Sequence, residues 1–415
     1  MRKTLRAFRP AGTVRMQPSK SVLHRALICA ALAPGESELL NFAWSDDIQA
    51  TARCLEDLGM CHISVSGSVC TVQGGLNEPG RPELDCGESG STVRFLLPLA
   101  LDGSERTFVG RGRLMQRPFA PYADICREQD IRFEHEGDRI TVCGSLLPGT
   151  FSLPGDISSQ FITGLLLALP RLEEPSAIEL ETPLESAGYV EITRSVQELF
   201  GVSTEAHGDS FRIGAPQSYR PAQLAVEGDY SHATFFAVAA ALAGKLEIAG
   251  LNPDSVQGDR AVFELLSRIG ADLDWNGQTV TVTKGDLQPF DMDVSQIPDA
   301  VPALSVLAAG INGTSHIRNA GRVRLKESDR LQAMAEELAR LGVNVEQGED
   351  SLTVHGTGRL RGGDVETHGD HRVAMALAVA SLLADEPVVI HNAEVVAKSG
   401  PQFFREWEII GGTEA

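Results

Sequence analysis

Six nearly continuous apolar runs, each preceded by small polar, charged or glycine residues, recur along the chain of 415 residues. Successive runs start 68 to 72 residues apart, at Lys20, Ser91, Ser159, Ser231, Asp299 and His371. A run that is apolar around its whole circumference predicts a helix that is buried on all sides. An interval this regular predicts a fold assembled from six copies of one structural unit.

Further elements follow each apolar run in the same order. A short apolar segment predicts a strand, for example at residues 246–248 and 315–317, and an amphipathic second helix comes after it. The residues directly after these second helices are Gly59, Asp130, Gly201, Gly270 and Gly342. Glycine is usual there because it readily adopts the left-handed conformation, so Asp130 is the exception. Two short strands around a turn, such as Asn276-Gly277, complete a βαβαββ unit.

The sixth repeat is shorter than the others, because it reaches Ile410-Gly411 and lacks the two final strands. We expect residues 4–15, which precede the first apolar run, to supply part of what it lacks. The chain is therefore predicted to be an α/β protein with two domains of three repeats each. One domain is residues 16–226 and the other is residues 1–15 together with 227–415. Small-ligand sites lie preferentially between domains, so we expect the active site in the cleft between them.

Composition narrows the class of protein. The formal net charge of −20 argues against binding of nucleic acid or of a membrane surface, since both need a positive surface. No apolar run reaches the roughly 18 residues of a membrane span, and we expect a soluble, cytoplasmic protein. The seven cysteines all lie within the first 143 residues and form no C-x-x-C pair, which favours reduced, buried thiols.

Charged residues stand where helices are expected to begin. Five of the eight residues at positions 324–331 are charged, and Ser328 or the acidic residues around it are expected to start the helix that follows. If this stretch is helical, Lys326 and Arg330 lie on one side of it. Taken alone, such a stretch is more often a solvated helix start. Lys20 and Arg25 are likewise near a helix start, where cations are disfavoured unless an anion binds there.

The recurrence of these groups in a repeated unit strengthens a functional interpretation, because equivalent ends of similar units point toward one place. The basic residues collected in this way are Lys20, Arg25, Arg117, Lys326, Arg330, Arg372 and Lys398. They predict a site for more than one anionic group, such as a phosphate and a carboxylate. Asp299 and Glu327 are the carboxylates available for proton transfer.

Other kinds of site are not indicated by the sequence. The glycine-rich loop at residues 87–94 matches neither the phosphate loop of ATPases nor the G-x-G-x-x-G pattern of dinucleotide-binding folds. Ser158-Ser159-Gln160 offers hydroxyls and an amide to a polyol or a phosphate, although a serine pair is most often a helix cap. His368 and His371 lack a third ligand at a recognisable spacing, so no metal site is expected.

Eight short motifs together resemble one family over the full length of the chain. They are Pro18-Ser19-Lys20-Ser21 with Arg25, the loop at 87–94, Arg117-Pro118, Ser158-Ser159-Gln160, Ile297-Pro298-Asp299-Ala300, Lys326-Glu327-Ser328-Asp329-Arg330, Asp370-His371-Arg372 and Ala397-Lys398. Their order and spacing are similar to those of the bacterial EPSP synthases, in the enolpyruvyl transferase superfamily. The resemblance implies a two-domain inverse α/β barrel built from six βαβαββ repeats.

The resemblance also implies a reaction. The enolpyruvyl group of phosphoenolpyruvate would pass to the 5-hydroxyl of shikimate 3-phosphate by addition and elimination, with release of phosphate, on the way to chorismate and the aromatic amino acids. These small molecules would be the only partners, no cofactor would be needed, and the protein would be a monomer.

Residue roles are carried over by motif. Shikimate 3-phosphate would be held by Lys20, Ser21, Arg25, Ser158, Ser159, Gln160, Ser186, Asp299 and Lys326, with Tyr189 beside it. Phosphoenolpyruvate would be held by Lys20, Gly90, Arg117, Gln160, Arg330, Arg372 and Lys398. Asp299 would be the base at the attacking hydroxyl and Glu327 would move the proton at the methylene carbon, assisted by Lys20 and His371.

The sequence departs from the family pattern at Glu88 and at Arg322, and two alternative functions are open. Glu88 places an extra carboxylate in the glycine-rich loop, which should weaken anion binding unless it pairs with a cation such as Arg94. Arg322 stands where other members have asparagine, and no role is assigned to it. A UDP-N-acetylglucosamine enolpyruvyl transferase would carry a cysteine in the loop at 110–118, which has none. A non-catalytic phosphometabolite-binding protein is the second alternative, and the joint presence of Lys20, Asp299, Glu327 and Arg330 argues against it.

Overall fold

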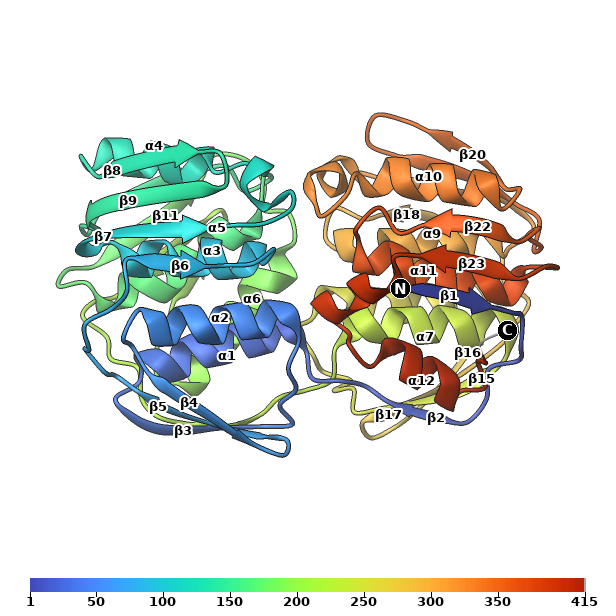
Figure 1. Ribbon diagram of the computed structural model, residues 1–415, viewed down its shortest axis with the longest axis horizontal. Helices are drawn as coiled ribbons and strands as arrows, with labels where there is room; N and C mark the ends of the chain where they lie inside the picture. The colour runs from blue at the N-terminus through green and yellow to red at the C-terminus, as the bar shows by residue number, and fades with distance from the viewer. Residues whose placement is uncertain (414–415) are drawn as a thin grey trace. The chain divides into compact units, whose positions relative to one another are not determined.

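The structure, a computed structural model, describes residues 1–413. It divides into two compact units, one made of Met1–Gln17 with Glu227–Ala415 (unit 1) and the other of Pro18–Val226 (unit 2). The chain passes between the units twice, after Gln17 and after Val226. Each unit holds three successive repeats (Figure 1).

Unit 2 contains the first three repeats. The first has α1 (Lys20–Leu32), β3 (Gly35–Leu40), α2 (Asp46–Asp57), β4 (His62–Ser66) and β5 (Val69–Gly74). The second has β6 (Glu83–Asp85), α3 (Gly90–Leu96), β7 (Asp102–Val109), α4 (Ala120–Glu128), β8 (Arg132–Glu136) and β9 (Arg139–Ser145). The third has β10 (Thr150–Leu153), α5 (Ser159–Ala168), β11 (Ser176–Leu180), α6 (Ala187–Leu199), β12 (Glu205–His207) and β13 (Ser210–Ile213), and β14 (Gln223–Ala225) follows it.

Unit 1 begins with β1 (Arg2–Leu5) and β2 (Thr13–Arg15) and continues with the last three repeats. The fourth has α7 (Tyr230–Ala243), β15 (Lys245–Ala249), α8 (Ala261–Arg268), β16 (Asp272–Asn276) and β17 (Thr279–Thr283). The fifth has β18 (Asp291–Asp293), α9 (Val301–Ala309), β19 (Gly313–Arg318), α10 (Arg330–Arg340), β20 (Asn344–Gln347) and β21 (Leu352–Gly356). The sixth has β22 (Gly363–Glu366), α11 (His371–Ala380), β23 (Val388–His391) and α12 (Phe403–Ile409).

Short 3₁₀ turns connect several of these elements. In unit 2 they are η1 (Pro98–Ala100), η2 (Leu114–Gln116) and η3 (Leu169–Arg171). In unit 1 they are η4 (Gly258–Arg260), η5 (Pro298–Ala300), η6 (Gly321–Leu325), η7 (Ser381–Leu383) and η8 (Ala393–Lys398).

The strands form six separate sheets, one for each repeat, which confirms the six-unit α/β architecture. In a complete sheet such as β6-β7-β9-β8, the first strand pairs in parallel with the second, and the hairpin that follows is antiparallel. The first repeat obtains its leading strand from β14, which pairs with β3 in parallel. The fourth repeat obtains its leading strand from β2, which pairs with β15 in parallel.

The N-terminal segment is used differently from the prediction. Figure 1 shows β1, in blue, beside β23, in red, and the two strands pair antiparallel in the sheet of the sixth repeat. This strand fills part of the gap left by the short sixth repeat, as expected. The prediction was wrong for Thr13–Arg15, because β2 belongs to the fourth sheet.

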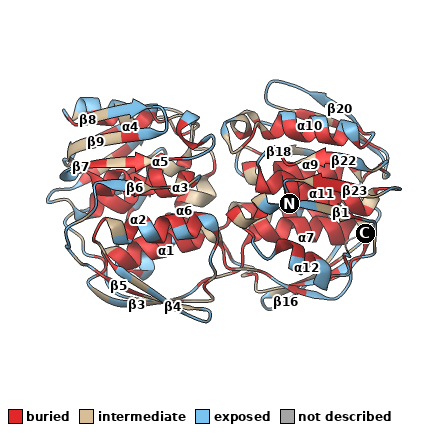
Figure 2. Cartoon of the chain, in the orientation of Figure 1, coloured by how far each residue is buried: buried red, intermediate tan, exposed pale blue. Residues whose placement is uncertain are grey.

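The apolar runs are the buried helices, and they form a separate hydrophobic core in each unit (Figure 2). Twelve of the fourteen residues of α7 are buried, so its lack of a polar face matches its position. The second helices stop as predicted, with left-handed residues just after them. Asp130 adopts the same conformation, at φ +55°, as the glycine of the other repeats.

The cysteines are free thiols, six of them buried and Cys143 half-buried. None of the helices within residues 1–413 combines the length and the apolar character that crossing a membrane requires.

Candidate active site

The charged stretch at 324–331 lies in unit 1 and ends in α10. Asp329 caps this helix, since its carboxylate accepts a hydrogen bond from the Gln332 N–H at 3.0 Å. The expectation that Ser328 starts the helix was wrong, because its hydroxyl donates to Asp370 Oδ2 at 3.1 Å instead. Lys326 precedes the helix in an extended conformation, so it does not share a helical face with Arg330.

Arg330 is the centre of a buried charge cluster and is only 1% exposed. Its guanidinium donates to three carboxylates, those of Asp299 at 2.7 Å, Glu327 at 3.0 Å and Asp370 at 2.8 Å. Burial acts to lower the pKa of Arg330, but the three carboxylates outweigh it and raise the pKa above its ordinary value. The cation and its partners therefore hold one another in fixed positions.

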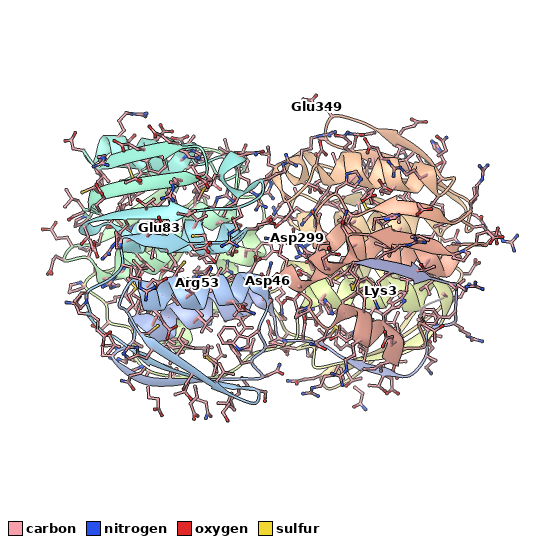
Figure 3. The ribbon with its side chains drawn as sticks, in the orientation of Figure 1. Lys3, Asp46, Arg53, Glu83, Asp299 and Glu349 are labelled. Atoms are coloured by element: carbon pink, nitrogen blue, oxygen red, sulfur yellow. The ribbon has the colours of Figure 1, made fainter. Side chains whose placement is uncertain are left out.

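Asp299, labelled in Figure 3, lies in the turn η5 just before α9. Its second oxygen accepts from Arg372 Nη2 at 2.9 Å, and Lys326 Nζ lies 3.6 Å from the first. Burial acts to raise the pKa of Asp299, but Arg372, Lys326 and Arg330 hold it well below its usual range. Asp299 is thus a carboxylate at neutral pH. Burial lowers the pKa of Lys326 to about 8.

The start of α11 supplies the remaining groups of this cluster. Asp370 caps the helix through the Arg372 N–H at 2.9 Å. His371 is 1% exposed, and its Nδ1 lies 3.7 Å from Asp370 Oδ1. Asp370 therefore links His371 and Arg372 to the guanidinium of Arg330.

Lys398 is buried at the end of η8, in another segment of the same unit. The next residue, Ser399, accepts a hydrogen bond through its carbonyl from Gln17 Nε2 at 2.6 Å. Gln17 is the last residue before the chain enters unit 2. The position of Lys398 is thus fixed close to one of the two chain crossings.

Asp259 is a candidate residue that the sequence analysis missed. It is 4% exposed, and the Ser231 hydroxyl donates to its carboxylate. Burial and the negative charge of Asp299 raise the pKa of Asp259 to about 6. The position of Asp259 in its repeat could have identified it from the sequence. Asp259 lies just before the second helix of its repeat, as Lys326 and Lys398 do in their repeats.

In unit 2, Lys20 is the first residue of α1, where Ser19 is the cap. Lys20 Nζ lies 2.7 Å from Oδ2 of Asp47, which is in the first turn of α2. Asp47 is 5% exposed and was also missed, because a carboxylate in the first turn of a helix is favoured by the helix dipole in any case.

Arg25 lies one turn further along α1 and is 2% exposed. Its guanidinium donates to Thr193 Oγ1 at 2.7 Å, to the Tyr189 carbonyl at 2.9 Å and to the Ser21 carbonyl at 2.8 Å. The cation also lies 4.9 Å from the centre of the Phe95 ring. These partners are neutral, so the positive charge of Arg25 stays uncompensated by its contacts within residues 1–413.

Predicted site residues and their neighbours meet at the start of α3. A Cβ on Gly90 would lie 3.0 Å from Arg117 Nη1 and 3.4 Å from Gln160 Oε1, so these side chains border the glycine. Gln160 accepts from Arg94 Nη1 at 2.7 Å and donates to Ser91 Oγ at 3.1 Å. The sequence assigns Arg94 no role except as a cation that could pair with Glu88. In the structure its guanidinium donates to Gln160 and so orients that side chain.

The remaining predicted residues lie at the starts of α5 and α6. Ser158 caps α5 through the Gln160 N–H, and Ser159 is buried in its first turn. Ser186 precedes α6 with a left-handed backbone, at φ +58°. A non-glycine residue in that conformation is strained, and such strain often marks functional positions. The Glu88 carboxylate lies against Gly112, where a Cβ would meet its Oε1 at 2.6 Å.

Comparison with known proteins gives a consistent result. Residues 8–407 match the family model of EPSP synthase (3-phosphoshikimate 1-carboxyvinyltransferase). The chain is 43% identical to a 3-phosphoshikimate 1-carboxyvinyltransferase of Clostridium kluyveri and 42% identical to one of Clostridioides difficile, each time over 97% of this chain and 95% of the relative.

Solved structures are similar over the whole chain. The EPSP synthase of Acinetobacter baumannii is 25% identical, with a TM-score of 0.83 and complete coverage of both chains. The enolpyruvyl transferase NikO of Streptomyces tendae shares the fold, with a TM-score of 0.79 at 20% identity over 100% of this chain and 99% of that one.

Proposed function

The chain belongs to the EPSP synthase family, and from this membership we propose how its residues carry out the family's reaction. It is a transferase of the shikimate pathway with 3-phosphoshikimate 1-carboxyvinyltransferase activity. In this reaction the 5-hydroxyl oxygen of shikimate 3-phosphate bonds to C2 of phosphoenolpyruvate, while C3 gains a proton. The C2–O bond to phosphate then breaks and C3 loses a proton, which restores the double bond.

The cluster around Arg330 is the observation that supports the proposed chemistry best. Arg330 and Arg372 bind the carboxylate of phosphoenolpyruvate, and Asp299 accepts the proton of the attacking hydroxyl. Glu327 delivers and removes the proton at C3. Because both arginines donate to Asp299 before substrate binds, their transfer to phosphoenolpyruvate raises the basicity of Asp299 at the moment it is needed.

The remaining residues of unit 1 assist in this scheme. Lys326 holds a hydroxyl of shikimate 3-phosphate next to Asp299. Lys398 binds the phosphate group of phosphoenolpyruvate, and the buried His371 assists proton transfer from beside Asp370. Charge that is fixed before the reaction contributes most to stabilising its transition state.

Unit 2 supplies the cations and hydroxyls for the phosphate groups. Shikimate 3-phosphate is bound by the helix starts that carry Ser21, Ser158, Ser159 and Ser186, with the positive charge of Arg25 behind them. Phosphoenolpyruvate is bound where Lys20, Gly90, Arg117 and Gln160 converge on its phosphate. Gly90 matters because its missing side chain leaves space beside Arg117.

We also propose that the two units are domains, of residues 16–226 and of residues 1–15 with 227–415, and that both act on one pair of substrates. The protein is proposed to work as a monomer in the cytoplasm. Size-exclusion chromatography with light scattering tests whether the protein is a monomer, and a dimer would refute the proposal.

Phosphate release tests the reaction itself. The purified protein should release phosphate from phosphoenolpyruvate when shikimate 3-phosphate is present and not in its absence. Turnover supported by UDP-N-acetylglucosamine would assign the other branch of the superfamily. Binding of shikimate 3-phosphate without turnover would instead identify a non-catalytic binding protein.

A further inference from the structure

Two contacts of equal length connect α1 to α2 in unit 2. Lys20 Nζ lies 2.7 Å from Asp47 Oδ2, and His24 Nδ1 is hydrogen-bonded to Thr51 Oγ1, also at 2.7 Å. Both helices contribute residues four apart, which lie on one face and one turn from each other. The two contacts therefore join the same face of α1 to the same face of α2, one helical turn apart.

The contact between His24 and Thr51 is extended by further hydrogen bonds into the glycine-rich loop at residues 87–94. Thr51 Oγ1 is hydrogen-bonded to Thr92 Oγ1 at 2.7 Å, and the Thr92 hydroxyl donates to Ser89 Oγ at 2.7 Å. Ser89 is the cap of α3 and also accepts from the Thr92 N–H at 3.2 Å. It directly precedes Gly90, so the path runs from the helix of Lys20 to the loop of Gly90.

All the inner members of this path are removed from water. The exposed fractions are 1% for His24 and 0% for Thr51, Thr92 and Ser89. Buried polar groups that are hydrogen-bonded to one another favour one arrangement, whereas apolar side chains of the same shape tolerate small shifts. A row of buried hydroxyls between three helices thus fixes the distance between their starts more narrowly than apolar packing would.

We propose that Asp47, His24, Thr51 and Thr92 are positioning residues that set the place of the Lys20 ammonium relative to the Gly90 backbone. These four residues are called the α2 bracket below. The inference rests on the proposed function, in which Lys20 and Gly90 both hold phosphoenolpyruvate. Shikimate 3-phosphate shares α1 through Ser21 and Arg25, but its ligands Ser158, Ser159 and Ser186 lie at the starts of α5 and α6, outside the bracket. The bracket therefore affects the affinity for phosphoenolpyruvate more than the affinity for shikimate 3-phosphate.

Thr51→Val tests this selectivity, because valine keeps the shape and removes the hydroxyl that joins the two halves of the path. The KM for phosphoenolpyruvate should rise about tenfold, since small displacements of a binding group are costly. The KM for shikimate 3-phosphate should change less than about twofold. Thr51→Ser, which retains the hydroxyl, should restore most of the affinity.

Thr234→Val is the matched control. Thr234 is 1% exposed in α7, and its hydroxyl donates to the Tyr230 carbonyl of its own helix, at 2.9 Å. This variant loses a buried threonine hydroxyl outside the bracket and should leave both KM values within about twofold. Equal effects of the two valine variants on the KM for phosphoenolpyruvate would overturn the proposal.

A measurement without substrate separates this proposal from the proposed function. Amide hydrogen exchange of residues 87–93 should be faster in Thr51→Val than in the unchanged protein, and unaffected in Thr234→Val. Unchanged exchange in Thr51→Val would overturn the bracket whatever the enzyme's activity. Absence of phosphate release from the unchanged protein would overturn the proposed function and leave the exchange result to decide on the bracket.

Discussion

The buried arginines of the candidate site have different kinds of partner in the two units. In unit 1, Arg330 donates to three carboxylates and Arg372 donates to one of the same three. In unit 2, Arg25 contacts hydroxyls, carbonyls and an aromatic ring. Arg94 also donates to an amide and to a carbonyl, and it lies 4.9 Å from the centre of the Phe161 ring.

This difference in partners indicates that the charged groups of the two units have different roles. In unit 1, the three cations Lys326, Arg330 and Arg372 face the three carboxylates Asp299, Glu327 and Asp370. A balanced cluster changes the pKa of its members strongly when an anion joins it, which suits proton transfer. Neutral partners in unit 2 orient Arg25 without cancelling its charge, which suits the holding of a phosphate dianion. Lys20, with Asp47 beside it, is intermediate between the two kinds.

The largest effect should come from removing the centre of the unit 1 cluster. Arg330→Met leaves three buried carboxylates without their shared cation, so the free energy of unfolding should fall by about 3 to 5 kcal/mol, with loss of turnover. Urea unfolding followed by circular dichroism measures this. Arg340→Met, on the same helix, should cost less than about 1 kcal/mol, because the half-exposed Arg340 lies 3.6 Å from Glu337 and Glu337 keeps its contact with His368 Nε2 at 2.7 Å. A loss in Arg330→Met as small as the loss in Arg340→Met would show that the cluster contributes little to stability.

Glu327→Gln tests the proton-transfer role within the same cluster. The amide keeps the size of the side chain and an oxygen for Arg330, so the fold should persist while turnover falls about 10² to 10⁴-fold. Steady-state phosphate release measures the rate. Glu336→Gln, an exposed change on α10, is the control and should be neutral. Near-normal turnover of Glu327→Gln would remove Glu327 from the mechanism.

Arg25→Met is the counterpart in unit 2. Because Arg25 is bonded to hydroxyls and carbonyls rather than to a carboxylate within residues 1–413, its loss should lower the free energy of unfolding by only about 1 to 3 kcal/mol. The KM for shikimate 3-phosphate should rise roughly a hundredfold, since a charge-assisted contact to phosphate is lost. Arg53→Met, in α2 and half-exposed, is the control. A loss of stability as large as that of Arg330→Met would contradict the distinction between the units.

The repeat was predictable from the sequence because it depends on local patterns. Apolar helices and glycine stops recur at a fixed interval, and even Asp130 stands at the equivalent left-handed position. The sharing of strands was only partly predictable. β2 joins β15 across more than two hundred residues, and nothing near Thr13–Arg15 indicates that partner.

The candidate site was predictable in its cations and not in their partners. Lys20, Arg25 and Arg330 are conspicuous because cations at buried helix starts are unusual. Asp47 and Asp259 occupy positions where carboxylates are common, so their roles depend on which helices meet in three dimensions. The same reason explains Ser328, whose hydroxyl turned out to bond Asp370 rather than its own helix.

The smallest effect concerns Asp259, a fourth carboxylate beside the balanced cluster. Burial and Asp299 raise its pKa from 3.8 to about 6, so its ionised form is unfavourable in the folded state at pH 7. Lowering the pH from 7 to 5 should therefore stabilise the protein through this group, and Asp259→Asn should remove that gain and add on the order of 1 kcal/mol at pH 7. Urea unfolding at pH 5, 6 and 7 measures both effects, with the exposed change Asp272→Asn as the control. If the pH dependence of Asp259→Asn equals that of the control, Asp259 is no part of the unit 1 cluster, and the balance of three cations with three carboxylates stands without it.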